Sequence, residues 1–565
     1  MARILPLLLV ASAASATPGP GSVVVVARAD DPESVALAER YAAARSVPAN
    51  RVCALPLPAA EALSQAEYEG ALLGPLRACL GPRAAEIEAA VLVRGVPRLV
   101  RVAGEEVSTA AALALWESTL GAEPLLGQAP GVGVPCGGGA ECLGPRWENP
   151  FRVGPFRAGW TARTGGVRWR PLLVTALDGR DAAEAESLLT SALTAEREGP
   201  EPAPFLLMDG ADPARGVLDP TLDGVADALE ARGIAVERLP FDGELSGRRF
   251  GSFVTGSAAL GQAIEGNTLA PGAAVDNLTS FGAVPLNFSH EGEAQVSVGR
   301  FIAAGAAGVH GTVAEPLNGC FPDRRFLVDL VDGATLAEAY HRALPNAYWR
   351  NLVLGDPLAA PWASRPVVRV VVSPAGEARV EVDDERGVQG IELYVDGERV
   401  AQGRSRASLV ACLAGAGGRV LAVAETRGEH PARGWAVVDA AWDGAACGEA
   451  DAGVVADAGP GDAAPPAGGP DGGPEAGPDA GPDAGPDAGP GLPPDAAVEA
   501  QGDARPAGPP ADAGAAADAP PAGGGGCHAA AGRFPLPIAP FALIGVAIAR
   551  RRWYRSRTLA GGRSR

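Results

Sequence analysis

The first two thirds of the chain alternate continuous apolar runs with segments of helical period. Residues 23–27 (VVVVA) form an uninterrupted apolar run, the kind that is buried on both faces of a parallel sheet. A helical pattern over 31–44 follows, with Asp30 or Asp31 as its N-cap. Because this alternation continues to about residue 364, we expect a three-layer α/β region with a mostly parallel sheet.

The predicted elements fall into two runs of α/β units. The first run has strands at 52–55 and 89–94 and a helix at 64–80 between them. Residues 121–168 are rich in Gly and Pro and predict an irregular insertion. The second run has helices at 182–197, 221–232, 295–304 and 335–343, and strands at 172–179, 204–210, 234–239, 251–254, 273–278, 307–309 and 351–358.

Beyond residue 364 the period changes to short alternating strands. Segments such as ARVEVDD and GIELYVDGERVA are separated by turn residues, and Asp396-Gly397 is a strong hairpin-turn signal. We expect residues 365–446 to form a small β-sandwich of immunoglobulin-like type.

Both ends of the chain predict export and anchoring. Arg3, the apolar run 4–10 and the small residues 11–16 predict a signal peptide cleaved after Ala16. Residues 447–526 repeat Pro, Gly, Ala and Asp and predict a disordered stalk. In the tail, 527–565, Cys527 precedes an apolar run over 534–549 and then the cluster Arg550, Arg551 and Arg552.

The tail has two interpretations. Its apolar run is about sixteen residues, short of the ~20 that an unstrained membrane helix needs. This favours a sorting signal that is cleaved and replaced by an anchor on Cys527, at the cell surface. The alternative is a permanent transmembrane helix whose arginines lie on the cytoplasmic side of the membrane.

These patterns divide the chain into six parts. The predicted domains are a signal peptide (1–16), an N-terminal α/β region with a Cys-containing insertion (17–168), a second α/β domain (169–364), the sandwich (365–446), the stalk (447–526) and the tail (527–565).

Composition excludes several classes of function. The 565 residues include no lysine, which excludes a phosphate-binding Walker lysine and Schiff-base chemistry. A net charge of −20 without a basic stripe argues against nucleic acid as a partner. No GxGxxG motif follows a strand and no Cys or His cluster has zinc spacing, so we expect no cofactor and no structural metal.

The eight cysteines predict disulfides, since an exported chain folds in an oxidising compartment. Connectivity does not follow from sequence alone. Plausible pairs are Cys53–Cys79, Cys136–Cys142 and Cys412–Cys447, which leave Cys320 and Cys527 over.

Several stretches resemble a functionally uncharacterised family of exported bacterial proteins, associated with genomes that encode exosortase-type sorting systems. The resemblance covers roughly residues 20–362. It rests on RSVPANRVCALPLP (45–58), VLVRGVP (91–97), APGAAVDNLTSFGA (270–283), GAAGVHGTVAEP (305–316) and NLVLGDPLAAP (351–361). The tail, with its single Cys527, is similar to the sorting signals of myxobacterial surface proteins.

A more distant similarity is to gingipain-type cysteine peptidases, which have a caspase-like fold followed by an immunoglobulin-like domain. It implies a His-Gly pair near Thr255-Gly256 and a nucleophile near Thr279-Ser280. Here no histidine precedes His290 and no cysteine lies between Cys142 and Cys320. Because the expected base and thiol are absent, the similarity implies the fold and not the activity.

Three residues remain candidates for catalysis. His310 and Cys320 could form a Cys–His pair with Glu315 orienting the imidazole, or Ser280 could pair with His310. The alternative is that His310 simply ends a strand and that Cys320 is idle or in a disulfide.

Acidic residues at strand ends are a second candidate site. The rule that ligands bind at strand carboxyl ends places Asp178, Asp209, Ser280, His310 and Asp356 near one edge of the sheet. The aspartates at 178, 209, 276 and 356 could bind a divalent cation. Turn chemistry is the preferred explanation for an Asp before a Gly at a strand end.

Two functions follow as hypotheses. The first is a surface-anchored, non-catalytic protein used in binding or cell-envelope assembly, with the membrane, the sorting machinery and a surface protein or glycan as partners. The second is a divergent cysteine or serine hydrolase, a peptidase or transpeptidase, acting at the cell surface.

Overall fold

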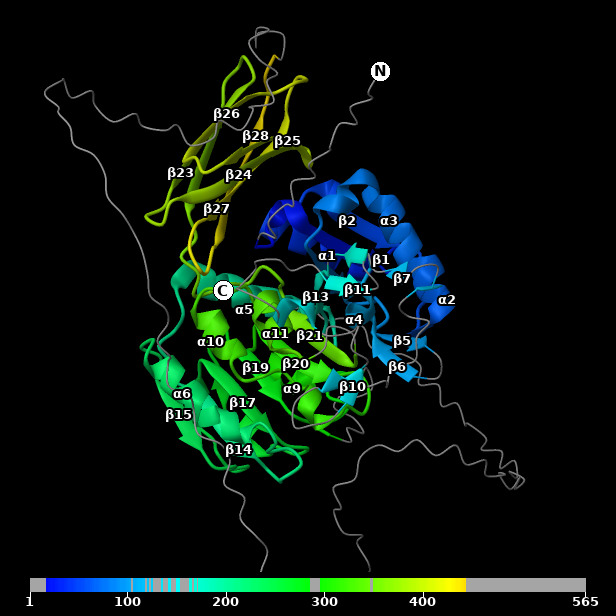
Figure 1. Cartoon of the computed structure of the whole chain (residues 1–565), viewed down its shortest axis with the longest axis vertical. Coiled ribbons are helices and arrows are strands. Elements are labelled where there is room, and N and C mark those ends of the chain that lie inside the picture. The colour runs from blue at the N-terminus through cyan, green and yellow to red at the C-terminus, as the bar shows by residue number, and fades with distance from the viewer. Residues whose placement is uncertain are drawn as a thin grey trace, which may run out of the picture. The chain divides into compact units, whose positions relative to one another are not determined.

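The computed structural model describes residues 17–443 apart from short gaps, and its main feature is a ten-stranded sheet (Figure 1). The gaps are 103–104, 117–118, 121–122, 125–133, 136–140, 144–148, 153–161, 165–166, 170, 285–294 and 346–348. The predicted signal peptide, the whole stalk and the whole tail, including Ala16, Cys527 and Arg550–Arg552, lie outside the described residues.

The strands of the large sheet lie in the order β15-β14-β17-β19-β20-β21-β13-β4-β1-β2. Their bounds are β1 (Val23–Arg28), β2 (Val52–Leu55), β4 (Ala89–Val93), β13 (Leu173–Leu177), β14 (Phe205–Gly210), β15 (Val236–Leu239), β17 (Ser252–Gly256), β19 (Ala274–Asn277), β20 (Gly308–Thr312) and β21 (Asn351–Gly355). The sheet confirms the α/β class and a mostly parallel arrangement, since β20 and β21 are its antiparallel pair.

The two predicted runs of α/β units contribute strands to this same sheet. Strand β13 of the second run pairs in parallel with β4 of the first, from Leu173 opposite Ala89 to Leu177 opposite Val93. In Figure 1 the blue strands β1 and β2 and the green strands β17, β19 and β20 therefore belong to one sheet. We call the α/β part, residues 17–364, the head.

Helices cover both faces of the sheet. In β14, Leu206 and Met208 belong to one buried cluster and Phe205 and Leu207 to another, because successive side chains of a strand point to opposite faces. The first cluster includes side chains of α7 (Gln262–Glu265) and α9 (Val298–Ala303). The second includes α6 (Leu222–Glu230), α10 (Phe326–Val331) and α11 (Leu336–Ala343). This is the expected three-layer arrangement.

The other helices in the described part of the head are α1 (Pro32–Arg45), α2 (Gln65–Glu67), α3 (Gly74–Leu80), α4 (Thr109–Ala114) and α5 (Ala182–Glu198), with 3-10 turns between elements. Asp31 caps α1 by accepting hydrogen bonds from the N–H groups of Glu33 and Ser34. The helix predicted over 64–80 is interrupted by a π-helix at Tyr68–Leu73. The interruption precedes Pro75, which has no N–H to continue an α-helical ladder.

Short strands make up the smaller sheets of the head. They are β3 (Ala62–Ser64), β5 (Leu99–Val102), β6 (Glu105–Ser108), β7 (Thr119–Leu120), β8 (Glu123–Pro124), β9 (Val134–Pro135), β10 (Glu141–Leu143), β11 (Ala162–Thr164), β12 (Val167–Trp169), β16 (Arg249–Phe250) and β18 (Thr268–Leu269).

Seven antiparallel strands confirm the predicted β-sandwich. One sheet has the order β22-β23-β26 and the other β25-β24-β27-β28, and side chains of both sheets share one buried cluster. Asp396 and Gly397 both have positive φ and connect β24 to β25 as predicted. The strands are β22 (Val367–Val372), β23 (Glu377–Asp383), β24 (Val388–Val395), β25 (Glu398–Arg404), β26 (Ser408–Cys412), β27 (Gly418–Thr426) and β28 (Arg433–Ala440).

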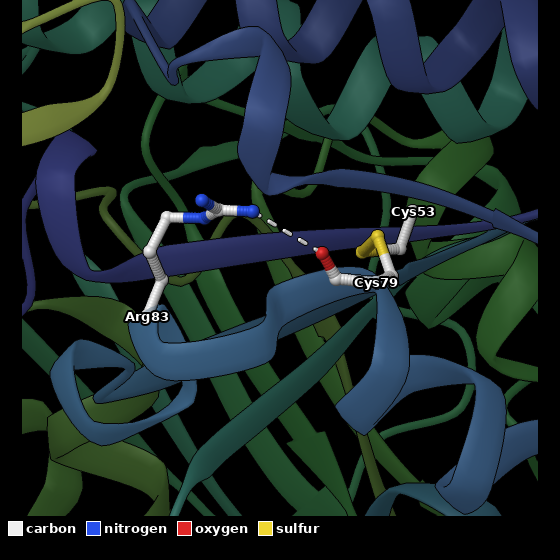
Figure 2. The surroundings of a disulfide bond; sticks show 3 residues. All are labelled: Cys53, Cys79 and Arg83. Carbon is white, nitrogen blue, oxygen red and sulfur yellow. Dashed lines mark hydrogen bonds between the residues drawn. A yellow bond between two sulfur atoms is a disulfide. The ribbon is translucent and has the colours of Figure 1, made fainter.

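The predicted disulfide Cys53–Cys79 is present (Figure 2) and joins β2 to α3. Arg83 donates a hydrogen bond to the Cys79 carbonyl at 3.4 Å beside it. Cys412 is also in a disulfide, but Cys447 and the side chains of Cys136 and Cys142 lie outside the described residues. Over the ranges that the structure describes, no helix combines the length and apolarity that a bilayer span needs.

Candidate functional site

The candidate site lies where β14, β17 and β19 end. These three strands are parallel, so the residues that follow Gly210, Gly256 and Asn277 meet at one edge of the sheet. Thr279 and Ser280 come just after β19, and Ser280 is 7% exposed. Phe281 has φ +61°, a strained value for a bulky residue, and it turns the chain immediately after Ser280.

The polar groups of Thr279 and Ser280 are engaged by two side chains from later in the sequence. The Ser280 hydroxyl donates to Glu315 Oε1 at 2.8 Å, and the Ser280 N–H donates to Gln295 Oε1 at 2.9 Å. The Thr279 hydroxyl donates to the same Gln295 oxygen. The Glu315 side chain is exposed whereas Ser280 is nearly buried, so only the carboxylate side of this pair is open to solvent.

A loop over residues 211–218 covers the end of β17. The Ala211 N–H donates to the Gly256 carbonyl at 2.7 Å, and the Arg215 carbonyl lies directly over the Gly256 Cα. A Cβ at Gly256 would be well inside van der Waals contact with that oxygen. The Arg215 guanidinium also donates to Gln295 Oε1, at 3.3 Å, which links this loop to Thr279 and Ser280.

Thr255 occupies the position where the similarity to gingipain-type peptidases implies a histidine. It is 2% exposed, and its hydroxyl donates to the Asp209 carbonyl at 2.9 Å. Its own carbonyl accepts from Arg324. Thr255 is therefore part of the packed interior.

His310 is a core residue inside β20, which corrects its prediction as a residue at a strand end. Its Nδ1 is 2.6 Å from Asp276 Oδ1, its Nε2 is 2.9 Å from Asn351 Oδ1, and its ring packs edge-on against Phe321. Both ring nitrogens are thus engaged away from Ser280, whose hydroxyl goes to Glu315. Glu315 consequently does not orient the imidazole.

Burial lowers the pKa of His310 to about 4, so the imidazole is neutral at pH 7. A neutral ring donates one hydrogen, which goes from Nδ1 to Asp276 because that carboxylate also pairs with Arg324. Asn351 Nδ2 has no partner among the described residues and would reach Nε2 if the amide is turned by 180°. This Asp276–His310–Asn351 chain ties together β19, β20 and β21.

Cys320 is in a disulfide, which corrects its interpretation as a spare thiol. A disulfide sulfur is neither a nucleophile nor a base, so the proposed Cys320–His310 pair does not form.

The strand-end aspartates do not gather at one edge. Strand β21 is antiparallel to β20, with Gly355 opposite Gly308. Asp356 therefore lies beside the start of β20, at the edge opposite Ser280, whereas Asp209 lies on the same edge as Ser280.

Each of these aspartates is neutralised by an arginine. The pairs are Asp178–Arg98, Asp209–Arg238, Asp276–Arg324 and Asp356–Arg45. Among the described residues, no group of three His, Cys, Asp or Glu side chains could hold a metal ion. The cation hypothesis loses its support, and ion pairing accounts for these positions.

Asp356 is the centre of a buried clamp made of Tyr41, Arg45, Glu196 and Arg365. Its carboxylate accepts from the Tyr41 hydroxyl at 2.9 Å and from Arg45 Nε at 2.5 Å. Glu196 accepts from Arg45 Nη1 at 2.5 Å and from Arg365 Nη2 at 3.0 Å. Burial alone would raise the pKa of Glu196, but Arg45 and Arg365 lower it to about 2.

A shallow depression of about 540 Å³ lies elsewhere, along α5. Its lining includes Thr190, Ser191 and Thr194 of that helix and Arg249. The Ser191 hydroxyl donates to the Gly305 carbonyl at 3.0 Å, and Arg249 pairs with Glu201 at 2.7 Å, so its main polar groups are already bonded.

Sequence reasoning found Ser280 but missed its partners. Gln295, Glu315 and Arg215 are 15, 35 and 65 residues from Ser280, on separate loops. No spacing rule relates them, so only the strand order would have suggested that they meet.

Comparisons with known proteins find no matching family model and no matching curated protein. Among solved structures, the complex of Porphyromonas gingivalis RgpB pro- and mature domains is similar with 9% identity and a TM-score of 0.42, over 74% of this chain and 99% of that chain. A structure titled only as a protease has 12% identity and a TM-score of 0.39, over 74% and 98%. The Clostridium perfringens spore cortex lytic enzyme SleM has 12% identity and a TM-score of 0.12, over 47% and 79%. All three TM-scores are below 0.5.

Proposed function

We propose that this chain is an exported, surface-anchored protein whose head has a caspase-like fold and binds a partner without catalysis. In this proposal the head and an immunoglobulin-like sandwich stand on the acidic stalk, and the partner is a surface protein or glycan of the cell envelope.

One observation carries the non-catalytic part: a closed hydrogen-bond network fills the edge where the resemblance implies a catalytic pair. The Arg215 carbonyl covers Gly256, Thr255 is buried with its hydroxyl bonded, and Gln295 holds Thr279 and Ser280. A general base must be within hydrogen-bond reach of its nucleophile. The imidazole of His310 is instead held by Asp276 and Asn351 in the core.

Disulfide bonding removes the second candidate nucleophile. Cys320 has no thiol to ionise, and Cys53, Cys79 and Cys412 are likewise in disulfides. A cysteine hydrolase would need a thiolate at this edge. The described cysteines supply none.

The anchoring part of the proposal rests on the two ends of the sequence. Residues 1–16 have the pattern of a cleaved signal, and 527–565 combine Cys527, a short apolar run and three arginines. A long acidic Pro/Gly/Ala/Asp segment before such a tail is typical of a spacer that holds folded domains away from a membrane. A spacer of this kind would suit a binding role, because it would hold the folded domains where a partner at the cell surface can reach them.

Activity-based labelling tests the absence of catalysis. The purified full-length protein and its Ser280→Ala variant are treated with a fluorophosphonate probe and with a thiol-reactive probe. We expect no labelling above that of a heat-denatured sample. Labelling of the native protein that Ser280→Ala abolishes would overturn the proposal.

One observation favours a serine hydrolase as the second candidate. The Ser280 hydroxyl donates to Glu315 at 2.8 Å, and the strained Phe281 presents it at a sharp turn after a strand. Glutamate is in general a weaker base than histidine, so such a pair would activate serine poorly. If Ser280 is labelled, Glu315→Gln should abolish the labelling while leaving the folded state intact.

Mass spectrometry of the protein from cells tests the anchoring. We expect a mature chain that begins at Thr17 and whose C-terminus lies at or near Cys527. An intact Arg565 would contradict the cleaved tail, and an intact Met1 would contradict the signal peptide.

A further inference from the structure

Charged side chains of the head and of the sandwich form a cluster where the two parts contact each other. The junction cluster consists of Arg51, Glu86 and Glu88 from the head, and Glu392, Arg399, Glu425 and Arg433 from the sandwich. The segment Thr17–Ser22 lies against it and is buried along its whole length.

Arg433 is the centre of the cluster. Its guanidinium is 2.9 Å from Glu425, 3.3 Å from Glu88 and 3.8 Å from Glu392. The Arg433 and Glu425 side chains are 6% and 7% exposed, whereas Glu88 and Glu392 keep 21% and 23%. Arg433 also donates to the Ser22 hydroxyl at 3.3 Å, so one side chain bridges three segments of the chain.

Arg51, on the head side of the cluster, also contacts the sandwich. Arg51 donates to Glu86 and to the Gly21 carbonyl, both at 2.6 Å, and its guanidinium lies 5.6 Å from the centre of the Tyr394 ring. A Cβ at Gly21 would collide with that Tyr394 ring. The head and the sandwich are therefore fitted closely here.

Charge does not balance across these contacts. The cluster joins three guanidinium groups to four carboxylates, since Arg399 contacts both Glu86, at 3.6 Å, and Glu392, at 2.9 Å. Grouped carboxylates that are shielded from water cannot all ionise without a cost. One bound proton would bring the cluster to neutrality.

We propose that the junction cluster is a proton-operated joint, which holds the sandwich on the head when one proton is bound and loosens when that proton leaves as the solution changes from acidic to neutral. The proposal does not depend on whether the head is catalytic, because the cluster lies outside the candidate site.

Glu88 is the group that binds the proton. Burial raises the pKa of Glu88 to about 7; Arg433 and the Ser22 hydroxyl oppose this, while Glu392 and Glu425 add to it. The same residues face Glu88 from β24, β27, β28 and the N-terminal segment. The pKa of Glu88 is about 7 in the closed joint and 4.5, the ordinary value, in the open joint. The stabilisation by the proton is therefore complete below pH 4.5 and is lost as the pH rises from 4.5 to 7.

Hydrogen exchange of the full-length chain tests the joint. Exchange of peptides from β28 and from residues 17–28 is measured at pH 4, 5, 6, 7 and 8 for the wild type and for Glu88→Gln. The ratio of the two at each pH cancels the intrinsic pH dependence of exchange. The ratio should be close to one at pH 4, should rise by up to about tenfold per pH unit between 4.5 and 7, the slope for one proton, and should level off above pH 7.

Two further variants make the outcome decisive. Glu392→Gln also balances the cluster and should flatten the pH dependence, which covers the case in which Glu88→Gln does not fold. Glu398→Gln is the matched control, because Glu398 contacts Arg83 at the exposed rim of the same interface and should leave the pH dependence as in the wild type. A constant ratio from pH 4 to 7, or a pH dependence that survives both Glu88→Gln and Glu392→Gln, would overturn the proposal.

Discussion

The backbone carbonyl of Arg215 lies over the Cα of Gly256, so that the loop after β14 closes the end of β17. The contact fills the space that a side chain at this position would otherwise occupy. Only glycine, which lacks a Cβ, allows the loop to approach so closely.

Gly256→Ala should therefore destabilise the head. The added methyl group would push the Arg215 carbonyl away and break the Ala211–Gly256 hydrogen bond, at a cost of about 1–3 kcal/mol. Chemical denaturation followed by circular dichroism measures the free energy of unfolding. Gly224→Ala is the matched control: it lies in α6 with open space around its Cα, and alanine there should be neutral or stabilising. Equal effects of the two substitutions would show that the loop contact is unimportant.

Loss of the Asp356 carboxylate should be among the most damaging changes to the head. Asp356→Ala leaves Arg45 and the Tyr41 hydroxyl buried with fewer partners, and we expect a loss of about 3 kcal/mol or more. Asp332→Ala is the control, because its pair with Arg232 is partly exposed and should be worth less than about 1 kcal/mol. Similar unfolding midpoints for the two variants would contradict the assignment of Asp356 to a buried clamp.

Acid should destabilise the head through its two buried histidines. Burial lowers the pKa values of His310 and His341 to about 4, from 6.5 in an unfolded chain. The unfolded state therefore binds more protons between pH 6.5 and 4, so stability falls with pH in this window, by up to about 1.4 kcal/mol per pH unit for each histidine. Denaturation midpoints at pH 7, 5.5 and 4.5 test this. A midpoint that stays constant over that range would show that neither histidine is buried and neutral.

Reduction should weaken the N-terminal part of the sheet. The Cys53–Cys79 disulfide closes a sequence separation of 26 residues, and its loss should cost about 3 kcal/mol. The Cys53→Ser/Cys79→Ser double variant isolates this bond from the other disulfides. Thermal unfolding of the double variant, with and without reductant, measures the effect. An unchanged melting temperature would contradict it.

Local patterns were enough to predict most strands and helices. The apolar run at 23–27 became β1 because both faces of the sheet are covered there, and Asp31 caps α1 as its position predicts. The hairpin turn at Asp396-Gly397 is likewise determined by its own two residues, which both have positive φ. In each of these cases, residues close together in sequence determine the element.

The candidate site was predicted less well because it depends on strand direction and on long-range contacts. Placing Asp356 beside Ser280 assumed that every strand runs the same way, whereas β21 is antiparallel to β20. The sequence predicts His310 at the end of a strand. In the structure it lies in the core, where it contacts Asp276 and Asn351, which are 34 and 41 residues away in sequence. No local pattern carries this information.

The clamp around Asp356 also constrains the order in which the chain acquires its structure. Arg45 and Asp356 are 311 residues apart, and Thr17 contacts Pro431 across 414 residues. The first helix therefore lacks its final partners until the last strand of the head has been synthesised. Contacts between residues far apart in sequence slow folding. In the proposed export, slow folding would leave the N-terminal segment unfolded, and able to pass through a translocation channel, before the head folds.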